Sequence, residues 1–98
     1  MIPADLRTKI ILSVNRALLG EVFCQLRAVA CEVSSEKEFE LVFFVTCPIN
    51  EEQIEALSCI ETEVIADFPD SFDITHSIVT SVEVDVSSDG FLIFLKKL

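Results

Sequence analysis

The order of hydrophobic and polar positions predicts a helix at the start of the chain. From Asp5 to about Leu19 the apolar residues recur every three or four positions, which is the spacing of one helix face. Gly20 follows and favours the end of the helix. Leu12 and Leu19 fall on the opposite face of this helix. They are either covered by another part of the fold or exposed as a contact surface.

Two strands are predicted next, over residues 22–33 and 38–47. The second has the clearer pattern, because apolar and polar residues alternate along it. One set of alternate side chains is expected to face the core: Phe39, Leu41, Phe43, Val45 and Cys47. The polar residues 34–37 lie between the two strands and favour a hairpin.

A second helix is predicted from Asn50 to the residues before Pro69. Asn50 is a favourable N-cap, and the acidic residues after it match the positive end of the helix dipole. The expected core-facing side chains of this helix are Ile54, Leu57, Val64, Ile65 and Phe68. Two more strands are predicted at residues 78–86 and 91–95, with a turn at residues 87–90.

The order helix, hairpin, helix, hairpin indicates an α+β protein with a two-layer αββαββ plan. We expect a single domain over residues 1–98, with a four-stranded, mainly antiparallel sheet and two helices on one face. The other sheet face is expected to be open and apolar, with Val42, Phe44, Leu92 and Phe94 on it. Such a face binds a partner or is covered by a second copy of the chain, as in a homodimer.

Charge is distributed very unevenly along this pattern. The net charge is −10, and residues 38–95 contain thirteen acidic residues without a lysine or arginine. This excess argues against direct binding of nucleic acid or an anionic membrane and favours a basic protein partner. The alternative is that the acidic residues only keep the protein soluble. The expected partner-binding residues lie on the second helix and the loop after it: Glu51, Glu52, Glu55, Glu63, Asp67, Asp70 and Asp73.

Two further charged residues fall on predicted apolar faces. Glu61 points into the apolar side of the second helix, so it must be paired, protonated or at a contact edge. Arg7 lies on the apolar side of the first helix. An Arg7–Glu61 pair between the helices is one hypothesis for both.

Sequence motifs for catalysis or cofactor binding are absent. There is no phosphate-binding glycine loop and no zinc-ligand spacing, so no cofactor, metal or catalytic residue is expected, and the protein is not expected to be an enzyme. The single His76 is interpreted as a strand-edge residue. Cys24, Cys31, Cys47 and Cys59 are expected to be buried free thiols.

The sequence also bears on the cellular compartment. The first residues lack the continuous apolar stretch of a secretory signal, and no apolar run is long enough to span a bilayer. We therefore expect a cytoplasmic protein.

Several short strings resemble one family. The segments at residues 16–22 (RALLGEV), 26–29 (LRAV), 49–52 (INEE) and 62–69 (TEVIADFP) are similar to small bacterial immunity proteins of contact-dependent growth inhibition and other polymorphic toxin systems. Cys31, Cys47 and Glu61 depart from that pattern, and residues 91–95 are not diagnostic.

The resemblance implies a non-catalytic protein that binds and neutralises a cognate C-terminal toxin domain in the cytoplasm. Many such toxins are basic nucleases, for which an acidic protein is a natural competitor. Three alternatives stay open: an acidic inhibitor or adaptor of another nucleic-acid-binding protein, a homo-oligomeric structural protein, and an enzyme whose site forms only in a dimer.

Overall fold

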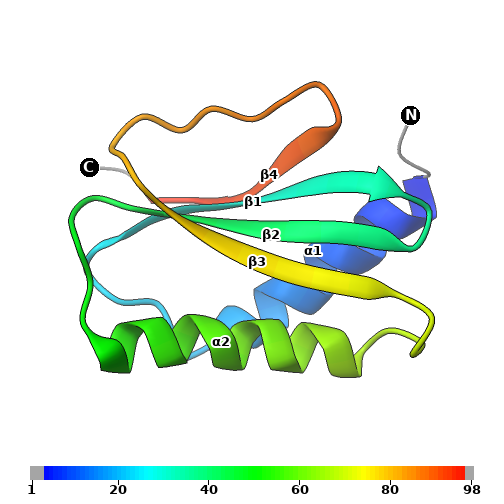
Figure 1. Cartoon of the computed structure of the whole chain (residues 1–98), viewed down its shortest axis with the longest axis horizontal. Coiled ribbons are helices and arrows are strands. Elements are labelled where there is room, and N and C mark those ends of the chain that lie inside the picture. The colour runs from blue at the N-terminus through cyan, green and yellow to red at the C-terminus, as the bar shows by residue number, and fades with distance from the viewer. Residues whose placement is uncertain (1–3, 97–98) are drawn as a thin grey trace.

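The computed structural model describes residues 4–96 and contains two helices packed on one face of a four-stranded sheet (Figure 1). The strand order is β3-β2-β1-β4, with two antiparallel pairs and one parallel pair. This confirms the predicted α+β class and the mainly antiparallel sheet. The elements are α1 (Ala4–Leu18), β1 (Leu26–Ser35), β2 (Glu38–Val45), α2 (Glu51–Ala66), β3 (Asp73–Thr80) and β4 (Gly90–Leu95).

Local sequence signals explain where α1 ends and where α2 begins. Gly20 has a φ of 81°, a left-handed conformation that favours glycine, and it lies two residues after Leu18, the last residue of α1. At the start of α2 the Asn50 side chain accepts a hydrogen bond from the Gln53 backbone, and the Gln53 side chain accepts one from the Asn50 backbone. The predicted N-cap is therefore confirmed.

The main core lies between the helices and the sheet. Phe39, Leu41, Phe43 and Val45 are buried there, as the alternation predicts. Cys47 is exposed, contrary to expectation, because β2 ends at Val45. The helices contribute a second set of buried side chains: Ile10, Val14, Ala17, Leu18, Leu57, Ile60 and Val64.

One face of α2 differs from the prediction. Ile60 is fully buried, whereas Ile54 and Ile65 are exposed. The buried stripe is therefore rotated towards Ile60 and runs through Leu57 and Val64. On α1, Leu12 and Leu19 are 66% and 77% exposed, so residues 4–96 do not cover them, and a contact surface stays a prediction.

The third strand begins earlier than predicted and pairs with a different neighbour. β3 runs parallel to β2, and β4 pairs antiparallel with β1 at the opposite edge of the sheet. The second hairpin expected from the sequence is therefore wrong. A parallel pair needs a long crossover, which α2 provides, and the chain must then cross the sheet to reach the far edge.

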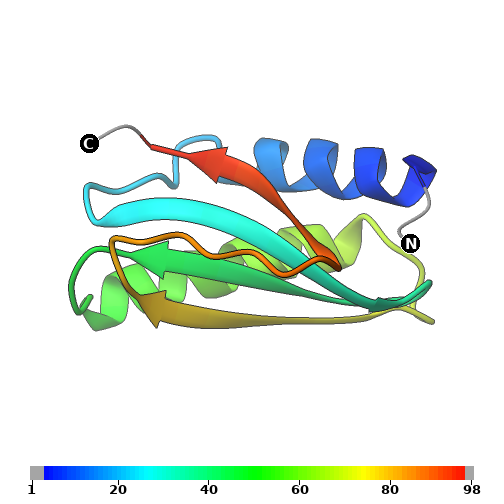
Figure 2. The same cartoon turned by 90° about the horizontal axis from the view of Figure 1, so that it is seen from above.

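Residues 81–89, here called the crossing segment, make that passage over the sheet face opposite the helices (Figure 2). Val84 and Val86 of this segment pack on Ala28, Ala30, Val42 and Phe44. The face predicted to be open is thus partly covered by the chain itself.

Leu92 lies on this outer face and is exposed, whereas Phe94 packs against the helix-side core. The placement of Phe94 corrects the prediction. Its cause is a register shift between Val29 and Ala30 in the pairing of β1 with β4, which moves Phe94 to the other side of the sheet.

Candidate functional site

The acidic residues singled out from the sequence lie mostly on one helix and the loop that follows it. Glu51, Glu52, Glu55 and Glu63 are exposed on α2. Asp70 is exposed in the loop after α2, and Asp73 is exposed at the start of β3. Exposed carboxylates keep their hydration, so they add long-range attraction for a basic partner without a large desolvation cost.

Asp67 has a different environment from the other acids. Its Oδ2 accepts a 2.6 Å hydrogen bond from the hydroxyl of Ser13, a buried residue of α1, and it also pairs with Arg16. The Ser13 hydrogen bond and then that from Arg16 hold the pKa of Asp67 below its usual range. Asp67 therefore joins α1 to α2, and part of its charge is neutralised within the protein.

A shallow cavity of about 300 Å³ adjoins this contact between the helices. Its lining mixes polar and small side chains from both helices: Ser13, Arg16, Ala17, Glu63, Ala66 and Asp67. The cavity is thus part of the α1–α2 seam.

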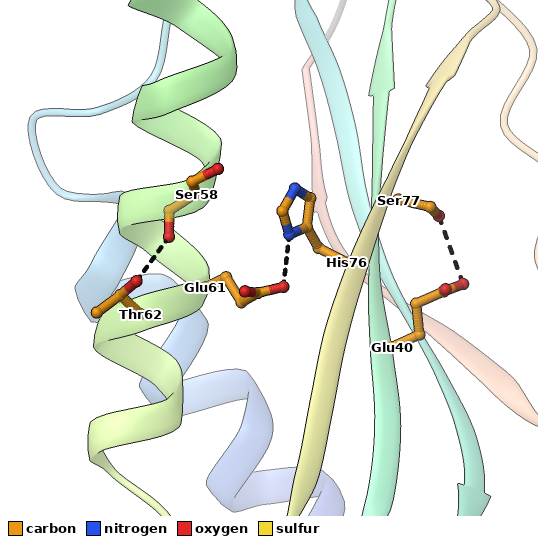
Figure 3. Close-up of polar contacts among 6 residues, drawn as sticks. All are labelled: Glu40, Ser58, Glu61, Thr62, His76 and Ser77. Carbon is orange, nitrogen blue, oxygen red and sulfur yellow. Dashed lines mark hydrogen bonds and ion pairs between the residues drawn. The ribbon is translucent and has the colours of Figure 1, made fainter.

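Glu61 is paired, but its partner is His76 rather than Arg7. The Nδ1 of His76 lies 2.5 Å from Oε2 of Glu61, and each side chain is about one-fifth exposed (Figure 3). Arg7 instead lies over the ring of Phe91, 5.1 Å from its centroid. The hypothesis of an Arg7–Glu61 pair is therefore wrong.

Sequence reasoning missed the role of His76 because it placed the third strand five residues too late. In the structure His76 lies in the middle of β3, on the face towards α2, and its ring packs edge-on to Phe43 at 5.8 Å. The available signal was the pair of apolar residues at Ile74 and Ile78, which share the alternation with His76. An imidazole between two core residues needs a polar partner, and Glu61 supplies it.

Two hydroxyl groups that neighbour the Glu61–His76 pair in the sequence make hydrogen bonds elsewhere. Ser77 is the hydroxyl next to His76, but it lies on the other side of β3 and donates a 3.4 Å hydrogen bond to Glu40 (Figure 3). The Thr62 hydroxyl donates to the carbonyl of Ser58 within α2. The Glu61–His76 pair is a polar contact that joins α2 to β3.

A metal-ligand cluster and a membrane-spanning helix each have requirements that residues 4–96 do not meet. No group of three or more His, Cys, Asp or Glu side chains in this range is placed to hold a metal ion. Neither described helix combines the length and the apolar character that crossing a bilayer requires.

The four thiols are free, as predicted, but only one is buried. Cys31 lies in the helix-side core, where burial raises the pKa of its thiol to about 12, with a smaller contribution from Glu32. Cys24, Cys47 and Cys59 are exposed, so the expectation that they are buried is wrong. Cys24 lies just before β1 and Cys47 just after β2, so both lie outside the regular elements that form the core.

The chain is thus a two-layer α+β domain whose second helix carries exposed acidic residues. The family model of the MafI2 immunity protein matches residues 7–97. The chain therefore belongs to the MafI2 immunity protein family, and the resemblance to small bacterial immunity proteins of polymorphic toxin systems is confirmed. The comparison with curated proteins found no match to this chain.

Proposed function

We propose that this protein binds a cognate toxin domain and neutralises it through the acidic surface of α2 and the loop after it. Membership of an immunity protein family supports a toxin as the partner. The observation that carries the choice of surface is the exposure of Glu51, Glu52 and Glu55 within a stretch, residues 38–95, that has no lysine or arginine.

A basic toxin domain, such as a nuclease with a groove for phosphate backbones, has the complementary charge. Attraction between such surfaces raises the association rate and suppresses unsuited partners. Binding to a nuclease groove would exclude its substrate without any reaction by the immunity protein. Neutralisation of this kind takes place in the cytoplasm, where the toxin acts.

Apolar side chains beside the acids would contribute to the lifetime of the complex. Ile54 and Ile65 are 42% and 44% exposed and lie on α2 between its acidic positions. Burial of apolar area at the centre of an interface, with charges at its rim, is the usual arrangement of a protein complex. We therefore place Ile54 and Ile65 inside the interface.

Co-expression tests the function itself. The C-terminal toxin domain encoded beside this protein's gene should arrest growth in a test bacterium, and co-expression of this protein should restore growth. A mixture of the two purified domains should give one complex in size-exclusion chromatography. Continued arrest despite soluble immunity protein would contradict the proposal.

Charge reversal tests the surface. Lysine in place of Glu51, Glu52 and Glu55 should slow association about tenfold or more at low salt and flatten its dependence on salt, because steering attraction is lost. The matched control reverses three exposed acids on other elements, Asp5, Glu36 and Asp89, which changes the net charge equally. Equal slowing in both variants would show that net charge, rather than this surface, governs binding.

A further inference from the structure

The crossing segment has the sequence pattern of a strand but no strand partner. Val82, Val84 and Val86 alternate with Glu83 and Asp85, which are both exposed. Val84 and Val86 point towards the outer face of the sheet and pack on its small apolar cluster. An alternation of this kind is typical of a half-buried strand. The segment therefore has the side-chain arrangement of a strand without the ladder that normally accompanies it.

The backbone of the segment is correspondingly free at its centre. Within residues 4–96, the N–H and C=O groups of Val84, Asp85 and Val86 make no hydrogen bond. The hydrogen bonds of the segment lie on either side of this centre: Ser81 N donates to Val45 O at 2.8 Å, Ser87 N donates to Glu32 at 3.2 Å, and Val33 N donates to Asp89 O at 3.2 Å. Unpaired groups of this type are a template for an added strand.

A groove lies between the crossing segment and β4, on the face seen in Figure 2. Its volume is about 880 Å³. The apolar walls are open to solvent, since Val82 is 54% and Leu95 49% exposed. The lining residues are Arg27, residues 82–86, Leu92 and Leu95.

Charges at the groove indicate which kind of segment fits it. Glu83 and Asp85 are exposed along one side. Arg27, the cation of the lining, donates to the carbonyl oxygens of Val82 and Lys96, so it is already engaged. One side of the groove therefore carries two exposed carboxylates, and this arrangement favours an apolar strand that also carries lysine or arginine. A second copy of this chain, with a net charge of −10, would be repelled.

We propose that an extended, basic segment of the toxin domain adds as a β-strand to residues 84–86. This inference rests on the proposed function and extends it to a second contact region. The segment's backbone pairs with the free N–H and C=O groups, its apolar side chains enter the groove beside Leu92 and Leu95, and its cations lie against Glu83 and Asp85.

Hydrogen exchange in the wild-type complex gives the first test. The amides of Val84, Asp85 and Val86 should exchange rapidly in the free protein and slow at least about tenfold when the neighbouring-gene toxin domain is bound, because pairing protects an N–H group. The amides of Glu36 and Lys37, in the turn between β1 and β2, are the internal reference and should not change. Unchanged exchange at residues 84–86 in a formed complex overturns strand addition while the proposed function stands.

A proline variant gives the second test. Asp85→Pro removes one backbone donor, whereas Asp85→Ala removes the same charge and keeps the donor. Asp85→Pro should bind the toxin domain about tenfold more weakly than Asp85→Ala, since one interfacial backbone hydrogen bond is lost. Equal affinities of two folded variants overturn the inference. Should Asp85→Pro not fold, exchange in the wild type decides. Failure of the wild type to bind overturns both proposals.

Discussion

The two faces of the sheet are closed in very different ways. On one face α1 and α2 cover a continuous core that includes fully buried Phe39, Phe43 and Ile60. On the other face a single irregular segment covers a cluster of only four buried residues with the partly buried Val84 and Val86. The first face is covered by two helices, whereas the second has an open groove beside the covering segment.

This difference separates stability from recognition. Dense packing of large side chains supplies most of the free energy of folding, and such a core tolerates little change. A face covered by few apolar contacts costs little to rearrange, and segments of low local stability commonly form binding surfaces. The helix side therefore holds the fold, while the outer face and the acidic side of α2 remain available for a partner.

Truncation on each face should give the largest contrast. Phe43→Ala should lower the free energy of unfolding by about 3–5 kcal/mol, because it leaves a cavity in the closed core. Val84→Ala should cost only about 1 kcal/mol, because two methyl groups of a half-exposed side chain are removed. Urea unfolding followed by circular dichroism measures both. Similar losses would show that the crossing segment is as important to stability as the helices.

Sequence patterns predicted the helix-side half of this comparison well. The alternation along β2 identified Phe39, Leu41 and Phe43 as core residues, and the Asn50 cap identified the start of α2. These features depend on neighbours within a few residues, which a single sequence contains.

The outer half was predicted less well, because it depends on contacts between distant segments. The alternation at Val82, Val84 and Val86 is real, but the ladder partner it implies is absent within residues 4–96. The partner of Glu61 was also missed, since His76 comes near α2 only through the parallel pairing of β3 with β2. The acidic candidate residues Glu51, Glu52, Glu55 and Glu63 of α2 are exposed, and their part in binding a partner stays a prediction.

A polar contact within the helix layer should give an intermediate effect. Asp67→Asn should lower the free energy of unfolding by about 1–2 kcal/mol at pH 7, because the buried Ser13 hydroxyl and Arg16 lose a charged acceptor. Glu32→Gln, which weakens the exposed contact of Glu32 with Ser87 in the crossing segment, should cost less than about 1 kcal/mol.

The same contact predicts a dependence on pH. The pKa of Asp67 is lower in the folded protein than its ordinary value of 3.8. Its contribution is thus fully present above that value and is lost as the pH falls through the folded pKa. The difference in stability between wild type and Asp67→Asn should therefore shrink below about pH 4. A constant difference down to pH 2 would mean that the charge of Asp67 contributes nothing.

The smallest effect, and the most direct test of how closed each face is, concerns thiol labelling. A thiol reagent at pH 8 should modify Cys24, Cys47 and Cys59 quickly, and Cys31 only when the helix side opens, because burial raises the pKa of the Cys31 thiol to about 12. Phe43→Ala should speed the labelling of Cys31, since it destabilises the core that covers this residue. Val84→Ala should leave that rate nearly unchanged, because Val84 packs on the opposite face. If both variants speed the labelling equally, the two faces open together, and the separation of stability from recognition does not hold.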